Sequence, residues 1–174
     1  GGRGVGLVVG RSAWGVRARK GRGGGTAAGG GADGTGARWG QFGKPVIGVP
    51  AAGGEAEEIE RMWLVDAVGE LLEAGRAKIY SCDSVSGAAM LRGDGDPRYR
   101  AALLRGFIEF VRHELIPMIR MDCDSEDVTV ITAGTSIGAF TAVSLRCHHP
   151  AVVTAAIGLP GTYDLSAFGG GRTR

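Results

Sequence analysis

The chain has 174 residues, a formal net charge of +2 and a hydrophobic content of 44%, values that fit a single globular domain. Glycine accounts for 33 residues, but there is no Gly-X-Y period and there are only 6 prolines, which excludes a collagen-like protein. The apolar runs are far shorter than the roughly 20 residues of a membrane-spanning helix, so we expect no membrane association.

Glycine and positive charge are concentrated towards the N-terminus. Residues 1–43 contain 17 glycines, seven basic residues and one acid, a net charge of +6, whereas 13 basic and 17 acidic residues give 44–174 a net charge of −4. A segment so poor in large apolar residues cannot offset the entropy lost on ordering. We therefore predict a disordered Gly/Arg-rich extension over 1–37, a domain over 38–168 and a disordered tail over 169–174. Since no Phe or Tyr lies among the arginines of the extension, we expect no nucleic-acid partner.

The first part of the predicted domain alternates strand and helix. A short apolar run bounded by prolines predicts a buried strand over 45–50. Four glutamates then favour a helix N-terminus, and the helix is expected over 55–74. A second strand follows over 77–82, and three glycines indicate a loop over 83–96. The apolar side of the helix would comprise Ile59, Met62, Trp63, Val65, Leu71 and Leu72.

The second part repeats this alternation. Apolar spacing predicts a long helix over 98–121, and Pro117 within it predicts a kink or break near Glu114. The remaining predicted elements are a third strand, a sharp turn, a helix and a fourth strand, over 127–133, 134–138, 139–147 and 152–159. Four strands separated by helices imply parallel strands with right-handed crossovers. The expected fold class is α/β, a three-layer sandwich with a mostly parallel sheet.

One motif points to chemistry. Residues 134–138 read Gly-Thr-Ser-Ile-Gly, a G-x-S-x-G pattern between the third predicted strand and the next helix. In this setting a tight turn lifts the hydroxyl of Ser136 above the strand end, and the flanking Gly134 and Gly138 let backbone pass closely. The helix that starts behind the serine favours a developing oxyanion. We predict that Ser136 is a nucleophile.

An oxyanion hole needs two donors. The backbone N–H of Ile137 would be one of them. The second would come from the loop after the first predicted strand, where we favour Ala52 and leave its neighbours Ala51 and Gly53 open.

Several blocks of the chain, in order, resemble a known family. They read RWGQFGKPVIGVPAAGGEAEEIERMWLVDAV, KIYSCDSVSG, ELIPMIR, VITAGTSIGAFTAVSLRCHHP and AIGLPGTYDLSAF, and they span roughly residues 38–168. This pattern resembles the esterase-D/antigen-85-like esterases of the α/β-hydrolase superfamily. The resemblance implies an α/β-hydrolase-like fold, Ser136 as the acyl-accepting nucleophile, the amides of Ala52 and Ile137 as the oxyanion hole, and a small-molecule ester or thioester as substrate.

A serine hydrolase also needs an acid and a histidine, which follow the nucleophile in this superfamily. Of the three histidines, His113 precedes Ser136, while His148 and His149 follow it by 12 and 13 residues, about 18 Å along a helix. A base must approach the hydroxyl to about 3 Å, so none of the three is usable. Only ten residues follow Asp164, and we therefore expect an N-terminal fragment, truncated after the strand that follows the nucleophile helix and inactive as it stands.

The cysteines indicate neither a metal site nor a cofactor. All three are widely spaced and no CxxC pair exists, so zinc is not expected. Cys82 and Cys147 lie in apolar segments and are expected to be buried. Reduced thiols favour a cytoplasmic location.

Two other interpretations stay open. The chain could be a non-catalytic α/β binding or interaction module in which the serine turn is only architecture. A flavodoxin-like domain would need a phosphate-binding loop after its first strand, where Glu55, Glu57 and Glu58 would repel the phosphate. Because a truncated sheet would end there, we expect the strand over 152–159 to be an uncovered edge, apolar on both faces.

Overall fold

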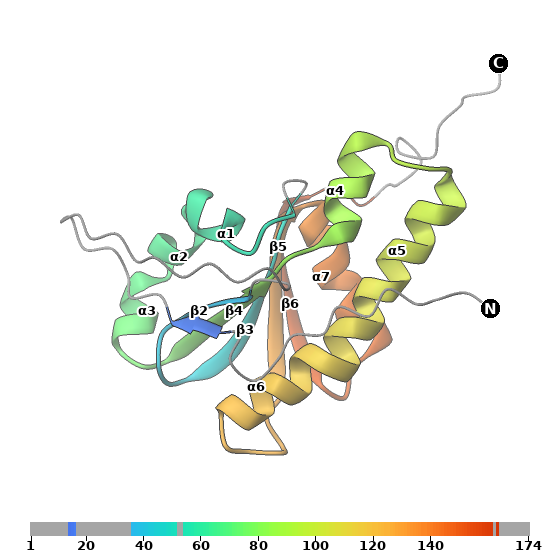
Figure 1. Cartoon of the computed structure of the whole chain (residues 1–174). Helices are drawn as coiled ribbons and strands as arrows, with labels where there is room; N and C mark the ends of the chain where they lie inside the picture. The colour runs from blue at the N-terminus through green and yellow to red at the C-terminus, as the bar shows by residue number, and fades with distance from the viewer. Residues whose placement is uncertain (1–13, 17–35, 52–53, 162, 164–174) are drawn as a thin grey trace.

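The computed structural model describes residues 14–16, 36–51, 54–161 and 163 of the chain, and the statements below concern those residues. They form a six-stranded sheet with helices on both faces (Figure 1). The strands are β1 (Trp14–Val16), β2 (Gly36–Trp39), β3 (Lys44–Val49), β4 (Ala77–Cys82), β5 (Val130–Ser136) and β6 (Val153–Gly161). The helices are α1 (Glu58–Arg61), α2 (Leu64–Ala67), α3 (Gly69–Glu73), α4 (Val85–Arg92), α5 (Pro97–Phe110), the π-helical turn η1 (Val111–Leu115), α6 (Ile116–Asp122) and α7 (Ile137–His148).

The sheet is mostly parallel. Its strand order is β1-β2-β4-β3-β5-β6, and only the pairing of β2 with β4 is antiparallel. Strand β3 is central, because Ile47 pairs with Tyr80 of β4 on one side and with Thr132 of β5 on the other. Parallel neighbours joined through helices are what the alternating pattern predicts, so the three-layer α/β class with a mostly parallel sheet is confirmed.

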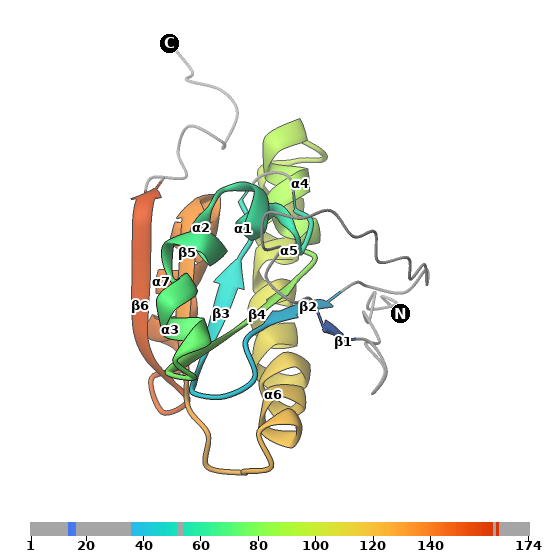
Figure 2. The same ribbon diagram turned by 90° about the vertical axis from the view of Figure 1, so that its left-hand side faces the viewer.

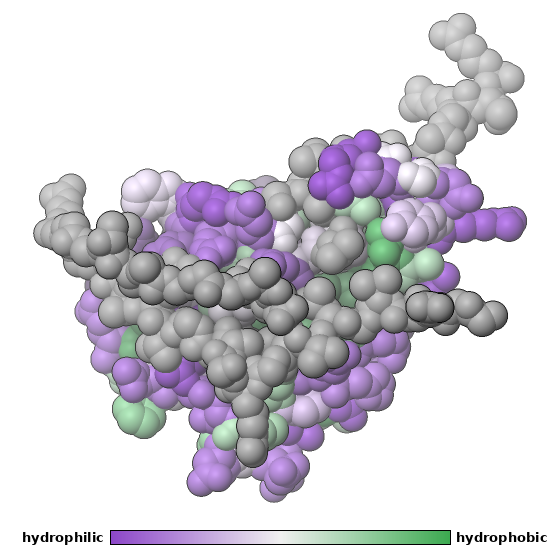
Figure 3. Space-filling model, viewed as in Figure 1, coloured by the Kyte–Doolittle hydropathy of each residue, from purple (hydrophilic) through white to green (hydrophobic). Residues whose placement is uncertain are grey.

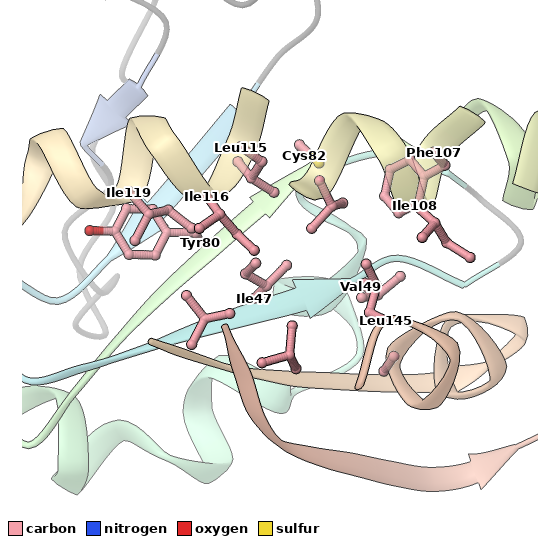
Figure 4. Packing of buried hydrophobic residues seen from close by; sticks show 14 of the residues in the cluster. Ile47, Val49, Tyr80, Cys82, Phe107, Ile108, Leu115, Ile116, Ile119 and Leu145 are labelled. Carbon is pink, nitrogen blue, oxygen red and sulfur yellow. The ribbon is translucent and has the colours of Figure 1, made fainter. Parts of the chain in front are cut away.

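Two clusters of buried side chains hold the three layers together. Helices α1 to α3 cover one face of the sheet, and α5 to α7 cover the other (Figures 1 and 2). The larger cluster lies under α4 to α7 and includes Ile47, Val49, Tyr80, Leu115, Ile116, Ile119 and Leu145 (Figure 4). The smaller cluster lies under α1 to α3 and includes Trp39, Ile59, Val65 and Ile79. Among the coloured residues on the face drawn in Figure 3, hydrophilic ones predominate, as expected where apolar side chains point inward.

The break predicted near Glu114 is a π-helical turn. Helix α5 passes into η1, and α6 continues directly from it through Pro117. Proline has no N–H to donate to the carbonyl of His113, and its ring crowds that carbonyl. A wider turn accommodates both effects, so the helical run continues and keeps Leu115 and Ile116 buried.

The continuous helix predicted over 55–74 is wrong. The structure has three short helices instead, interrupted at Trp63, whose φ is 61°, and again at Val68. Crowded glutamates and an internal glycine give this segment little preference for one helical axis. The interruptions turn Met62, Trp63 and Leu71 outward, with exposed fractions of 44%, 73% and 38%, whereas Ile59, Val65 and Leu72 stay buried as predicted.

The loop predicted over 83–96 is also wrong, because it contains helix α4. The N–H of Gly87 donates to Oγ of the N-cap residue Ser84 at 3.3 Å, and Gly93 ends the helix with a φ of 68°. These are ordinary start and stop signals for a helix. The glycine content obscured them, since Gly87 lies inside the first turn of the helix.

The edges of the sheet differ from the prediction at one end and agree with it at the other. Strand β1 belongs to the segment 1–37 and pairs in parallel with β2, which the sequence did not predict and which begins at Gly36. Five residues predicted to be disordered, 14–16 and 36–37, therefore lie in strands. Residues 1–13, 17–35 and 164–174 lie outside the described residues, and their disorder stays a prediction. Strand β6 is at the opposite edge, as expected, and its Ile157 is 48% exposed.

A charged cluster ties α6 to the sheet. Asp122, at the end of α6, accepts hydrogen bonds from Arg38 of β2, from Nζ of Lys78 at 2.7 Å and from the hydroxyl of Tyr80 at 2.6 Å. Burial by itself would raise the pKa of Asp122, but the three donors outweigh it and lower the pKa to about 2. The carboxylate therefore holds β2, β4 and α6 together in its charged form.

Candidate functional site

The strand order creates a switch point at the centre of the sheet. From β3 the chain passes through α1 to α3 to β4 on one side, and it later returns as β5 on the other side of β3. In open α/β sheets, ligands bind outside the carboxyl ends of the strands at such a point. Val49 ends β3 and Ser136 ends β5, so the predicted nucleophile lies at this switch point.

The backbone of Ser136 is strained. It is the last residue of β5, helix α7 begins at the next residue, and its φ and ψ are 53° and −126°. A residue with a side chain rarely adopts a positive φ, and such strain persists only where the surroundings impose it. The side chain of Ser136 is partly exposed, so the turn presents it to solvent.

The two glycines of the motif are required by close backbone contacts. A Cβ atom on Gly134 would lie 2.4 Å from the carbonyl carbon and oxygen of Gly138. A Cβ atom on Gly138 would lie 2.5 Å from the carbonyl oxygen of Val49 and 2.7 Å from that of Pro50. The first contact folds α7 back against β5, and the second lets α7 touch the end of β3. Neither neighbour is a flexible side chain, so neither could move aside.

The N-terminus of α7 supplies backbone donors beside Ser136. Helix α7 has 12 residues, and the first amides of a helix have no partner within it and carry the positive end of its dipole. Ile137 is the first of these residues, and its side chain is only 3% exposed, which anchors the turn. The carbonyl of Ile137 accepts a hydrogen bond from Oγ1 of Thr141 at 3.0 Å.

The second predicted donor falls in a short gap. Ala52 and Gly53 lie outside the described residues, so the convergence of the Ala52 and Ile137 amides stays a prediction. The flanking residues Ala51 and Gly54 are both buried at the carboxyl end of β3. The predicted oxyanion loop therefore begins and ends beside the same switch point as Ser136.

Sequence reasoning missed one neighbour of the serine. Oγ1 of Thr135, the residue before Ser136, lies 3.5 Å from Sδ of Met62, which follows α1. Met62 was expected to face the core, and the left-handed residue at Trp63 is what redirects this segment. No sequence signal short of predicting that turn would have placed Met62 beside the motif.

The histidines gather far from the serine. His148 and His149 lie at the opposite end of α7 from Ser136, as predicted. Nδ1 of His148 lies 2.8 Å from the carbonyl oxygen of Ser144, and Nε2 of His113 lies 3.2 Å from Glu109. Burial lowers the pKa of His149, whose charged surroundings also include His113, Glu109 and Arg112. Of the residues that the structure describes, no histidine can therefore act as a base for Ser136.

The three cysteines, all within the described residues, differ in their exposure. Cys82 is buried, as predicted, and burial raises the pKa of its thiol to about 12, which makes it unreactive. Cys147 is exposed, contrary to the prediction, because it lies on the outer side of α7, two residues from the buried Leu145. Within the described part of the chain, no three His, Cys, Asp or Glu residues are grouped as metal ligands.

None of the described helices is long and apolar enough to cross a membrane.

Comparison with known proteins places the fold. No family model and no curated protein sequence matches the chain. Among solved structures it is similar to an enterochelin esterase from Shigella flexneri, with a TM-score of 0.50 and 15% identity over 78% of this chain and 34% of that one. Weaker likenesses are a carboxylesterase structure from Nitrososphaera gargenis (TM-score 0.49, 16% identity, 75% and 42% covered) and an α/β hydrolase from the sediment metagenome of the Mar Chica lagoon, Morocco (0.46, 18%, 81% and 53%).

The likeness to the enterochelin esterase supports the expected fold and nothing finer. The chain has an α/β-hydrolase-like fold, which it shares with the enterochelin esterase. It spans between about a third and a half of the length of the three solved proteins. At identities of 15–18% the likeness concerns the fold and does not identify a substrate.

Proposed function

We propose that this chain carries the nucleophile-bearing part of a serine hydrolase for carboxylic esters or thioesters, of the esterase-D/antigen-85-like kind. The observation that carries the proposal is the strained backbone of Ser136 between β5 and α7, with Gly134 and Gly138 packed against backbone on both sides. Such a turn presents a serine hydroxyl at the end of the sheet and beside the amides of a helix N-terminus. The α/β-hydrolase fold is consistent with this role.

The proposed chemistry is acyl transfer. Oγ of Ser136 bonds to the acyl carbon of the ester, the bond to the alcohol or thiol breaks, and the serine proton leaves with that group through a base. The N–H groups of Ile137 and Ala52 would stabilise the negative charge on the carbonyl oxygen. Water then releases the acid from the acyl-serine. Because His148 and His149 lie at the far end of α7 and His113 lies in η1, we propose that the base is supplied from outside the described residues.

Chemical rescue tests this proposal. Imidazole added to the full chain would replace the missing base, and p-nitrophenyl acetate would then acetylate Ser136. Peptide mass mapping locates the acetyl group, and the exposed Ser125 serves as the internal measure of background acetylation. We expect imidazole-dependent acetylation of Ser136 well above that of Ser125, and its loss in Ser136→Ala. Equal acetylation at the two serines would refute the nucleophile.

A non-catalytic binding or interaction module is the second candidate. It is favoured by the separation of all three histidines from Ser136, because a hydrolase segment without a base can persist as architecture alone. Under this alternative, imidazole would not direct acetylation to Ser136. The same mapping experiment therefore decides between the two candidates.

A further inference from the structure

Two loops are joined at the carboxyl edge of the sheet. The first follows β3 and includes Ala51, Gly54 and Ala56, and the second follows β4 and includes Asp83 and Ser84. The N–H of Ala56 donates to Oδ1 of Asp83 at 2.9 Å, and the N–H of Ser84 donates to the carbonyl oxygen of Gly54 at 2.6 Å. The two bonds run in opposite directions, so each loop holds the other.

Close packing fixes the start of the first loop as well. A Cβ atom on Gly87, in the first turn of α4, would lie 2.4 Å from the carbonyl oxygen of Ala51. On the other side, a Cβ atom on Gly138 of α7 would lie 2.5 Å from the carbonyl oxygen of Val49 and 2.7 Å from that of Pro50. The end of β3 is therefore held between two helices, each of which contacts it through a glycine. Contacts of this kind leave the chain little freedom to shift.

The amide of Ala56 depends on Asp83. Ala56 has an exposed fraction of 0%, and a buried N–H without an acceptor costs the full desolvation of that group. A carboxylate is a stronger acceptor than a neutral oxygen. The N–H of Gly54 has its own acceptor in Oε2 of Glu58 at 3.2 Å, so the two amides are held by different carboxylates.

We infer that Asp83 is a positioning residue that fixes the loop after β3 before any substrate arrives. The inference rests on the proposed function in one respect, namely that a backbone amide of the loop after β3 stabilises the oxyanion. Oxyanion donors are effective only when they are held within about 0.5 Å of the productive geometry. Asp83 contributes to acyl transfer through the backbone of the loop, without contact to the ester.

Three variants of the full chain test this role. Asp83→Ala removes the acceptor, Asp83→Asn keeps a carbonyl oxygen in its place, and Asp94→Ala removes a carboxylate that pairs with Arg92 on the surface. The first readout is hydrogen exchange of the Ala56 and Gly54 amides, measured by NMR. The second is the rate of imidazole-dependent acetylation of Ser136 by p-nitrophenyl acetate. Circular dichroism of each variant reports whether it is folded.

We expect Asp83→Ala to raise the exchange rate of the Ala56 amide about tenfold or more, because one charge-assisted hydrogen bond is lost. The same variant should slow acetylation of Ser136 about tenfold, since a displaced donor stabilises the oxyanion less. Asp83→Asn and Asp94→Ala should stay within about threefold of the unaltered chain in both measurements. Rescue by asparagine is the result that a general loss of stability would not produce.

Unchanged exchange at Ala56 in Asp83→Ala would overturn the inference, as would Asp83→Asn behaving like Asp83→Ala. Should Asp83→Ala not fold, Asp83→Asn alone decides, because retained protection of Ala56 supports the role and lost protection refutes it. Failure of the proposed function has a different signature. The unaltered chain would then show no acetylation of Ser136, while exchange at Ala56 would still report whether Asp83 holds the loop.

Discussion

The contact between Gly134 and Gly138 can be tested by adding a single methyl group. Gly134 has no positive φ, so alanine could adopt its backbone, and in an open strand this substitution would stabilise the protein. Here the new Cβ would lie 2.4 Å from two backbone atoms of Gly138 and 2.9 Å from the amide nitrogen of Ala139. The helix would have to move away from the strand. Overpacking of this kind costs about 3 kcal/mol, and we expect Gly134→Ala to lose that much free energy of unfolding.

Urea unfolding followed by far-UV circular dichroism measures the change. The matched control is Gly106→Ala, because Gly106 is exposed on α5 and a Cβ atom there would meet nothing within 4 Å. Removal of a glycine from a helix should raise the free energy of unfolding by about 0.5–1 kcal/mol. If the two variants are equally stable, the close packing of β5 against α7 is refuted, and with it the physical basis of the strained serine.

Three further predictions concern pH and turnover. The pKa of Asp122 is about 2 in the folded chain and near 3.8 in the unfolded chain, so its contribution to stability is present above the unfolded pKa and is lost as the pH falls towards 2. Urea unfolding should show that acid lowers the free energy of unfolding by about 1–2 kcal/mol, and that Asp122→Asn lacks this loss. An identical loss in both proteins would contradict the prediction. Burial lowers the pKa of His149 below 6.5, so the unfolded chain takes up the proton first and the stability should fall as the pH drops through 6.5. His149→Gln should remove this fall, whereas the substitution His148→Gln, at an exposed residue, should not. A fall that persists in His149→Gln would refute the assignment. Without added imidazole the chain should hydrolyse p-nitrophenyl acetate no faster than Ser136→Ala, and a Ser136-dependent burst with a fluorophosphonate probe would disprove this expected inactivity.

Four of the six strands and the serine turn could be predicted because their signals are local. The β-branched run before the motif specifies a strand, and the following small and apolar residues specify a helix, whatever surrounds them. The strand nonetheless extends to Ser136, beyond the predicted end at Ala133. Pairing of Ser136 with Gly161 of β6 accounts for the extension, and a residue so distant in the chain leaves no local signal.

The segment between β3 and β4 could not be predicted in the same way. Its apolar spacing fits one helix, and Ile59, Val65 and Leu72 do face the core. A single left-handed residue at Trp63 changes the direction of the chain and brings Met62 to Thr135. That conformation is imposed by tertiary packing against the intrinsic preference of tryptophan, so it is invisible to periodicity.

The bond between Asp83 and Ala56 illustrates a different limit. An aspartate after a buried strand is a plain sequence feature, but its partner is 27 residues away and is a backbone amide. Any residue other than proline at position 56 would supply the same N–H, so the sequence does not indicate the pair. Gly87 is a similar case. A glycine is required there because a Cβ atom would collide with the carbonyl oxygen of Ala51, and not because the chain turns.

The strain at Ser136 gives the strongest physical reason to look for function at this turn. Three described residues other than glycine have a positive φ, namely Trp63, Asp124 and Ser136. Trp63 is in the left-handed helical region, with a ψ of 10°, whereas the ψ of −126° at Ser136 lies outside it, near a conformation that turns reserve for glycine. Glycine would adopt this φ and ψ without strain. The close backbone contacts at Gly134 and Gly138 hold the chain in this turn. A serine here costs stability that a turn connecting a strand to a helix does not require, and the proposed role as a nucleophile would account for that cost.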